Sequence, residues 1–269
     1  MDSYFMIDLV NVLISGLLIG SLYAIMALGL TIIHGVIRIF NFCHGGMSVL
    51  GGYLTFMFLS AFGFSLIPSI ILSCLLMFGF GLILYRTSIA FLVKKPNWEI
   101  TSVIFLLGLG ILMENLILQL FGPRVKEVPL FFEDVFEFGS ILIDQQDVVL
   151  VLFVIIFVLG LNLFFSRTWL GRSIRAVAQD MNGAKVVGIN ANRTLGLAFG
   201  LASAVTGLAG ILLATKYYLT PQVGWDWMFK GFIIVVFGGL GTISGAIFAG
   251  LFLGLVESLI PFYGSQSWV

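Results

Sequence analysis

Hydrophobic residues occur along this chain in long runs that polar and charged segments separate. The runs cover residues 9–33, 36–60, 65–85, 100–121, 148–165, 194–214 and 229–260. Each is long enough to cross a hydrocarbon layer about 30 Å thick as a helix. Lipid offers the backbone no hydrogen-bond partner, so helices are expected. The pattern predicts an all-α membrane protein, a polytopic bundle of about seven to eight transmembrane segments with broken helices, forming one domain over residues 1–269.

The composition agrees with a location in the membrane. Of the 269 residues, 60% are hydrophobic and only 10% are charged, and the mean hydropathy is +1.14. Soluble domains are about 25% charged. The formal net charge is zero, which gives no indication of a nucleic-acid partner. The lipid bilayer is therefore the expected surrounding.

The charges that do occur are unevenly distributed among the loops. Loop 86–99 carries three basic residues and one acidic residue, and loop 166–193 carries five basic residues and one acidic residue. Loop 122–147 is acidic, with six Asp or Glu residues, Glu133 among them, and two basic residues. The positive-inside rule places the two basic loops in the cytoplasm. The acidic loop and the N-terminus then lie outside.

One polar interruption lies within "VIRIFNFCHGGMSVLGGYLTF", residues 36–56. It contains Arg38, Asn41 and His44, followed by Gly45 and Gly46. Asn and Gly are poor helix formers, so an irregular turn is expected before a new helix. Broken helices at membrane depth often line substrate pathways. The alternative is a polar helix cap buried against a neighbouring helix.

A second interruption lies in the last hydrophobic run, "VVFGGLGTISGAIFAGLFLGLVE". Gly238, Gly239 and Gly241 fall within four positions of a run that is too long for one simple span. The run forms either one long segment or two shorter helices. Glycines also recur at four-residue spacing elsewhere, as at Gly16 and Gly20, which lets helices in lipid approach closely.

The remaining polar residues do not suggest enzyme chemistry. Cys43 and Cys74 match no metal-binding spacing, and His34 and His44 fit no zinc motif. Neither a metal site nor a cofactor is predicted. Glu114 lies inside a hydrophobic run, where a charge is costly and commonly functional.

Loop 166–193 contains the pattern of two short helices. The first is expected from Arg172 to Gln179, and the second from about Met181 to Val187. Asp180 is a suitable N-cap for the second helix, and Gly188 fits its C-terminal end. The segment could lie on the membrane surface, serve only to set topology, or dock a soluble partner.

Three stretches carry a resemblance to a known family. They are "GLTIIHGVIRIFNFCHGGMSVLGGYLTF", "GRSIRAVAQDMNGAKVVGINANR" and "GGLGTISGAIFAGLFLGLVES". In this order they resemble the permease subunits of bacterial ABC importers of the branched-chain amino-acid type. The resemblance covers nearly the whole chain. It implies that residues 180–189 form the coupling helix, which docks on an ATPase, and that Asn41, Phe42, His44 and Gly45 match the family's Asn-Phe-X-His-Gly motif.

The resemblance also implies partners, a location and a mechanism. The partners are a second permease subunit, homologous or identical, two ABC ATPase subunits and an extracytoplasmic solute-binding protein. The location is the bacterial inner membrane, and the mechanism is alternating access. The chain has no GxxxxGK[ST] nucleotide loop, so it is not expected to hydrolyse ATP and is not an enzyme.

The helix breaks, the intramembrane acid, the capped loop helix and the resemblance together give two groups of candidate residues. The expected substrate pathway comprises Asn41, His44, Gly45, Glu114, Gly238, Gly239 and Gly241, and the expected ATPase contact comprises Asp180, Gly183, Ala184, Val187 and Gly188. Two departures from the family pattern stand out. The acidic residue that usually follows His-Gly is here Gly46, and the chain stops at Trp268-Val269 where the family usually adds one more span, which indicates a shortened or partial member.

The identity of the solute stays open at this point. Branched-chain amino acids are the leading candidates for the solute, and urea and amides are alternatives within the same fold class. A stand-alone channel or secondary carrier is a different possibility, for which Glu114 and Glu257 are the candidate coupling charges. A membrane-embedded enzyme would need a catalytic cluster, which the spacing of the histidines and acids does not provide.

Overall fold

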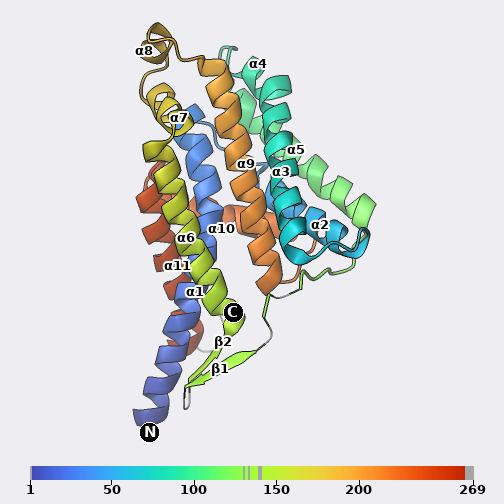
Figure 1. Ribbon diagram of the computed structural model, residues 1–269, viewed down its shortest axis with the longest axis vertical. Helices are drawn as coiled ribbons and strands as arrows, with labels where there is room; N and C mark the ends of the chain where they lie inside the picture. Colours follow the sequence, from blue (N-terminus) through green and yellow to red (C-terminus); the bar gives the residue numbers. More distant parts are fainter. Residues whose placement is uncertain (1, 130, 133, 139–140, 264–269) are drawn as a thin grey trace.

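The computed structural model describes residues 2–129, 131–132, 134–138 and 141–263, and shows a bundle of helices (Figure 1). The helices are α1 (Asp2–Ile37), α2 (His44–Ser60), α3 (Leu66–Leu84), α4 (Ala90–Leu92), α5 (Trp98–Phe121), α6 (Gln145–Arg167), α7 (Trp169–Gln179), α8 (Met181–Val186), α9 (Ala191–Lys216), α10 (Val223–Gly238) and α11 (Ile243–Tyr263). A π-helical turn, η1 (Tyr85–Ile89), joins α3 to α4. Strands β1 (Val135–Phe138) and β2 (Ile141–Asp144) complete the described elements.

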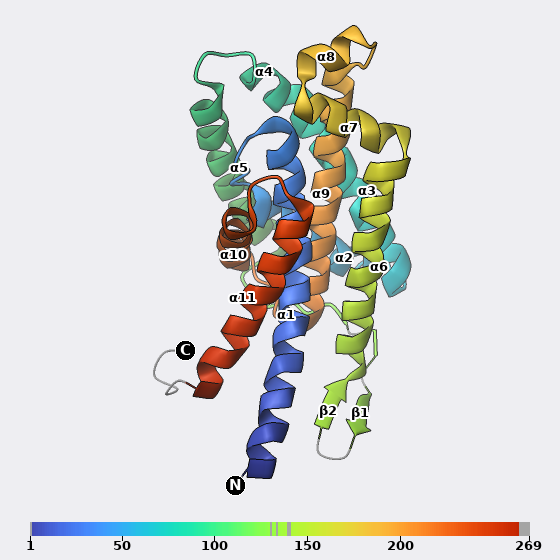
Figure 2. The ribbon, with the colours of Figure 1, turned by 90° about the vertical axis from the view of Figure 1, so that its left-hand side faces the viewer.

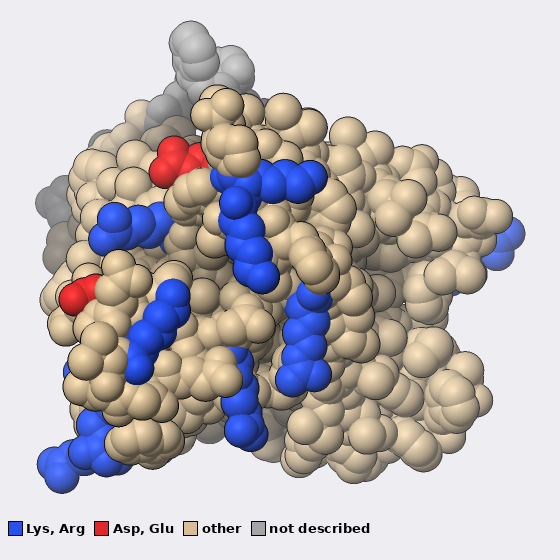
Figure 3. All heavy atoms as spheres, turned by 90° about the horizontal axis from the view of Figure 1, so that it is seen from above, with Lys and Arg blue, Asp and Glu red and all other residues tan. Residues whose placement is uncertain are grey.

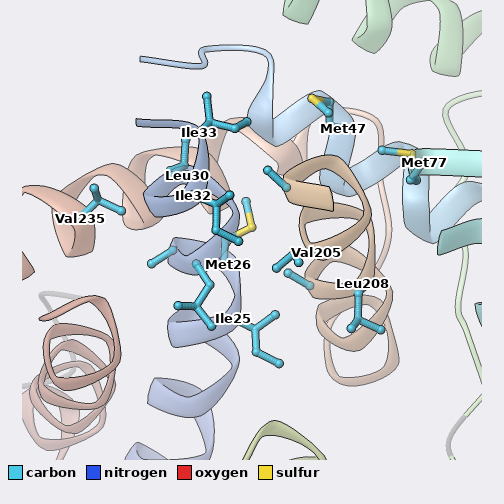
Figure 4. Close-up of a cluster of buried hydrophobic side chains, with 14 of the residues drawn as sticks. Ile25, Met26, Leu30, Ile32, Ile33, Met47, Met77, Val205, Leu208 and Val235 are labelled. Atoms are coloured by element: carbon cyan, nitrogen blue, oxygen red, sulfur yellow. The ribbon is translucent and has the colours of Figure 1, made fainter. Parts of the chain in front are cut away.

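Two helices form the centre of the bundle. Of the residues in the most apolar stretch of each helix, 89% are buried in α1 and 83% in α9. The corresponding share is 22% in α3, α5, α6 and α11. Figure 4 shows Ile25, Met26 and Ile32 of α1 near Val205 and Leu208 of α9. The outer helices thus enclose most of α9 and the C-terminal part of α1, whereas the N-terminal part of α1 remains exposed, for example at Phe5 and Met6.

The outer helices present large apolar side chains outward. Ile71 on α3, Ile104 on α5, Ile156 on α6 and Phe248 on α11 are all exposed. An apolar surface of this extent is expected where the solvent is lipid. Among the described residues, six helices are long and apolar enough to span a bilayer. With the shorter apolar helices α2 and α10 they make up the predicted polytopic bundle.

Both predicted interruptions separate helices. Residues 38–43 lie outside any helix between α1 and α2, and residues 239–242 separate α10 from α11. The last hydrophobic run is therefore two helices rather than one. Helix α10 is only 16 residues long because glycines with positive φ, Gly239 and Gly241, end it and reverse the chain.

The acidic loop contains a short antiparallel hairpin that the sequence did not predict. Val135 pairs with Asp144 and Phe138 with Ile141. The segment before the hairpin is fixed to the linker that precedes α10, because Lys126 forms an antiparallel backbone bridge with Leu219. The all-helical prediction therefore describes the membrane part of the molecule and not this loop.

The loops segregate by charge to the two ends of the bundle. Helices α4, α7 and α8, which belong to the two basic loops, lie at the end opposite the N-terminus and the hairpin (Figures 1 and 2). Viewed from the end that carries α4, α7 and α8, the surface shows many Lys and Arg side chains and few acidic ones (Figure 3). We call it the basic end.

Glycines allow α1 and α11 to approach closely. A Cβ atom added at Gly20 would lie 2.7 Å from the Cα of Leu251, and one added at Gly254 would overlap the backbone of Gly20. No real Cβ tolerates such a contact with backbone. The four-residue glycine spacing therefore serves helix packing here, as is common in lipid.

We predict that Gly254→Leu destabilises the protein strongly, because the backbone of α1 cannot move aside for a side chain. Overpacking costs typically 1–3 kcal/mol, and more where backbone is the obstacle. Thermal unfolding in detergent measures the effect. The matched control is Gly160→Leu on α6, where an added Cβ meets nothing within 4 Å. Equal melting temperatures of the two variants would contradict the close α1–α11 contact.

Candidate functional site

The first break begins at a residue with a rare backbone conformation. Arg38 has a φ of +61°, which costs energy for any residue but glycine. Its side chain is exposed and lines a hollow with Glu99 at the N-terminal end of α5, toward the basic end. The left-handed turn at Arg38 redirects the chain from α1 into the segment that leads to α2.

The Asn41 side chain stabilises the backbone within the break. Its side chain is fully buried, and its Oδ1 accepts a hydrogen bond from the backbone N–H of Cys43 at 3.1 Å. Its amide nitrogen contacts the Met47 sulfur at 3.5 Å. The expectation that Asn41 satisfies a backbone group freed by the break agrees with this contact. Asn41 is enclosed by protein.

His44, the first residue of α2, links three helices. Its Nε2 lies 2.9 Å from the carbonyl oxygen of Met26 in α1, and its Nδ1 lies 3.1 Å from the hydroxyl of Thr206 in α9. A carbonyl only accepts, so Nε2 carries a proton and donates to Met26; the Thr206 hydroxyl, whose single proton also has the Ala202 carbonyl oxygen as an acceptor at 2.8 Å, lies beside Nδ1. The side chain is 0% exposed. His44 therefore holds the N-terminus of α2 against both central helices and does not itself face a channel.

Gly45 lies directly on α10. A Cβ atom at Gly45 would overlap the carbonyl oxygen of Gly224, and one at Gly224 would lie 2.7 Å from the Gly45 oxygen. The chain beginning at Gly45 and the first turn of α10 thus touch backbone to backbone. Only glycine permits this at both positions.

Glu114 reaches the same place from α5. Its Oε2 accepts a hydrogen bond of 2.6 Å from the indole N–H of Trp225, the residue after Gly224. A small hollow lies here, bordered by Phe42, Gly45, Glu114 and Trp225 among others. Sequence reasoning singled out Gly45 and Glu114 but missed Gly224 and Trp225, because nothing near them in the sequence signals a partner so far away.

The second break lies elsewhere, against the end of α1. A Cβ at Gly241 would lie 3.0 Å from the Cα of Gly35, and a Cβ at Gly238 would overlap the carbonyl of Gly245. Gly239 has a φ of +92° and no backbone neighbour within 4 Å outside its own turn. The predicted pathway residues thus form two groups, one around Gly45 and one around Gly241.

The expected second helix of the cytoplasmic loop is present as α8. Oδ1 of Asp180 accepts from the backbone N–H of Asn182 at 2.9 Å, which is the predicted N-cap. Gly188 follows the helix with a φ of +86°. Gly183 packs against the capping carboxylate: an added Cβ would lie 2.6 Å from Oδ2 of Asp180. The preceding helix, α7, begins at Trp169, earlier than expected, because Thr168 caps it.

The outward face of α8 differs from the expected one. Ala184 is only 4% exposed and packs into the chain, whereas Val186 is 87% and Val187 75% exposed. Of the expected small and apolar contact residues, Val187 is available to a partner and Ala184 is not. Val186, which the sequence indicated as part of the helix's small apolar surface but not among the ATPase contacts, is the most exposed apolar residue of the segment.

Comparison with known proteins identifies the family. The family model described as "Branched-chain amino acid transport system / permease component" matches residues 12–269. No solved structure gives a significant match to the chain.

Several curated relatives cover nearly the whole chain. The high-affinity branched-chain amino acid transport system permease protein BraD of Pseudomonas aeruginosa is 30% identical over 91% of this chain and 84% of its own length. The corresponding protein LivH of Escherichia coli K12 is 29% identical over 98% of this chain and 89% of its own length. A probable LivH of Methanocaldococcus jannaschii is 29% identical over 94% and 81%.

The family match and the helical architecture agree. Within the described residues no group of three His, Cys, Asp or Glu side chains comes together that could hold a metal ion. The chain is a multi-pass membrane protein that belongs to the family of permease components of branched-chain amino acid ABC transport systems, and it is not itself an enzyme.

Proposed function

We propose that this chain transports branched-chain amino acids inward by alternating access, as one of two permease subunits that work with two ATPase subunits and an extracytoplasmic binding protein. The second permease is a homologous or an identical chain. The observation that carries the proposal is α8, a short helix capped by Asp180 at the basic end, whose exposed Val186 and Val187 have no partner within the described chain.

Helix α8 is suited to transmit motion. The caps fix its ends, and the buried Ala184 anchors it to the rest of the chain. The preceding helix α7 packs on α1, α6 and α9, so a displacement of α8 by an ATPase is passed to the central helices. Coupling of this kind requires contiguous packed elements.

The two breaks supply positions at which helices can move relative to one another. Helices α2 and α10 are short, each starts or ends at a break, and they meet at Gly45 and Gly224. Because backbone meets backbone here without interlocking side chains, α2 and α10 can slide past each other at a small cost in free energy. Asn41, His44 and Glu114 brace this junction, while Gly238, Gly239 and Gly241 form the second hinge. In this proposal Gly45 and Glu114 border the pathway and His44 positions α2.

The proposed orientation has the basic end in the cytoplasm and the N-terminus outside. The basic end carries α8, where an ATPase would dock, and the positive-inside rule agrees with that placement. The bacterial inner membrane is the proposed location. Glu133, used in the sequence argument for the outer loop, lies outside the described residues; the neighbouring Asp134 is described and exposed.

Two alternatives stay distinguishable by experiment. A stand-alone channel or secondary carrier would move its solute without ATP, and a related ABC permease for urea or amides would depend on ATP but prefer another solute. Uptake of leucine, urea and an amide into proteoliposomes that contain the complete complex, with and without internal ATP, separates the three cases.

The orientation predicts which positions an impermeant thiol reagent reaches. Single cysteines at Lys94 and Arg175 should react only after cells are permeabilised, and a cysteine at Asp134 should react on intact cells. The native Cys43 and Cys74 are buried and half-buried, so the unmodified chain provides the background. The reverse labelling pattern would show that the orientation is inverted.

We predict that Gly45→Ala impairs uptake because its methyl group overlaps the Gly224 carbonyl and forces α2 and α10 apart. The neighbouring Gly46→Ala is the matched control, because its methyl would overlap no backbone atom and would lie 3.3 Å from Cβ of Met113, a contact that a shift of a few tenths of an ångström relieves. Uptake per permease molecule should fall at least about tenfold for the first, since backbone overpacking costs more than 1–3 kcal/mol, and stay near the original for the second. Equal uptake by both variants would show that the contact between Gly45 and Gly224 serves only packing.

Substitutions in α8 test coupling. Asp180→Ala removes the N-cap, worth roughly 0.5–2 kcal/mol, and should weaken copurification of the ATPase without abolishing it. Val186→Asp places a charge on the proposed contact and should abolish copurification and uptake at equal permease abundance. Phe91→Asp, at another exposed apolar residue of the basic end, is the control. Full ATPase association of Val186→Asp would exclude α8 as the coupling element.

A further inference from the structure

A pair of opposite charges lies between α10 and α11. The Lys230 ammonium group of α10 is 2.6 Å from Oε1 of Glu257 in α11, and it also donates to the phenolic oxygen of Tyr23 in α1. Lys230 further lies over the Tyr23 ring, 4.8 Å from its centroid. Three helices thus meet at one charged cluster, which none of the sites described above includes.

The cluster lies at membrane depth. Residues 9–37 of α1 carry no Asp, Glu, Lys or Arg, and a bilayer is crossed by about 20 helical residues. Every window of that length within residues 9–37 contains Tyr23. The charges that contact Tyr23 therefore lie beside the membrane-spanning part of α1, on its side toward Tyr217 and the Lys216–Asp147 pair.

The pair is not enclosed by this chain. The side chains of Lys230 and Glu257 are 35% and 41% exposed. Charges that face lipid at this depth are costly and are found instead toward bundle interiors or water-filled cavities. Lipid is therefore an unfavourable neighbour for this face of α10, and a polar space or another protein surface is a favourable one.

The surroundings of the pair match a particular solute. Ile233 and Phe237 follow Lys230 by one and two helical turns on α10, and they are 56% and 71% exposed. The face therefore combines Lys230, the neighbouring carboxylate of Glu257 and adjoining apolar side chains, and the exposed Asp226 lies one helical turn before Lys230. A branched-chain amino acid carries one carboxylate, one ammonium group and an apolar side chain.

We propose that this face of α10 lines the translocation pathway, and that Lys230 and Glu257 transiently bind the carboxylate and the ammonium group of a passing amino acid. The inference rests on the proposed function, because the second permease subunit closes the other side of the pathway. Exchange of the internal ion pair for the ends of the zwitterion keeps every charge paired. Tyr23 accepts a hydrogen bond from the Lys230 ammonium group at the same point and positions it.

The first test measures access of water to the face. Ile233→Cys leaves the ion pair intact, and Ile156→Cys on the outer face of α6, 68% exposed, is the matched control. Both are treated with a negatively charged thiosulfonate in the assembled complex in proteoliposomes. Thiolates form in water and not in lipid, so Ile233→Cys should react at least about tenfold faster than the control. Saturating leucine should slow its reaction. Reaction as slow as that of the control would overturn the proposal.

The second test removes the charges together. Lys230→Met/Glu257→Gln should reduce leucine uptake at least about tenfold, since charge-assisted hydrogen bonds to the solute are lost, while ATPase copurification is retained. Lys216→Met/Asp147→Asn removes an ion pair of equal length between α9 and α6 and should leave uptake nearly unchanged. Normal uptake by the first double variant would overturn the binding role. If that variant is not produced stably, the cysteine measurement decides.

The unmodified complex separates this inference from the proposed function. If it shows no ATP-driven leucine uptake, the proposed function fails. If it transports leucine but Ile233→Cys is inert, or if leucine does not protect the reactive cysteine, the proposed function stands and only the role of the Lys230–Glu257 pair is overturned.

Discussion

Inside a bilayer no water is available to a peptide group that leaves a helix, and this constraint determines how the molecule is built around its two breaks. The first break is covered by protein: Asn41 is buried and accepts from the Cys43 N–H. The second break, residues 239–242, is partly exposed, and glycines bring the backbone around it close to its neighbours, Gly241 against Gly35 and Gly238 against Gly245. Helices α1 and α9, whose most apolar stretches are largely buried, provide the surfaces on which the breaks rest. Irregular backbone is possible here because two complete helices enclose it on the inside.

Local chemistry made part of this structure predictable. The break at Asn41 and Gly45, the end of α10 at Gly239, and the cap of α8 by Asp180 all depend on conformational preferences of a few adjacent residues. Such preferences can be recognised in a sequence without knowledge of the fold. The loop charges likewise predicted that two loops share one end of the bundle, as the structure shows (Figure 1). The Lys126–Leu219 pairing and the hairpin were not predicted, since short strands outside the membrane carry only a weak signal.

Contacts between distant residues explain what sequence reasoning missed. Glu114 meets Trp225, and His44 meets Thr206, across 111 and 162 positions of the chain. No periodicity connects such residues. The Lys230–Glu257 pair shows the same limit: the acid was noticed as an isolated intramembrane charge, while its partner became visible only when α10 and α11 were seen side by side. Ala184 was expected to face outward, and its burial depends on how α8 packs on the rest of the chain.

The position of α1 has a consequence for biogenesis. It leaves the ribosome before the other described helices, yet in the finished molecule it packs most extensively on α11, the last of the described helices, and on α9. Until those helices are synthesised, α1 has to remain in lipid as a solitary span. An amphipathic helix suited only to its final, protein-lined position would be unstable in lipid during that interval. The absence of Asp, Glu, Lys and Arg from residues 9–33 of α1 thus keeps the helix stable in lipid during this interval, and the glycines that later fit α11 add no polar side chain.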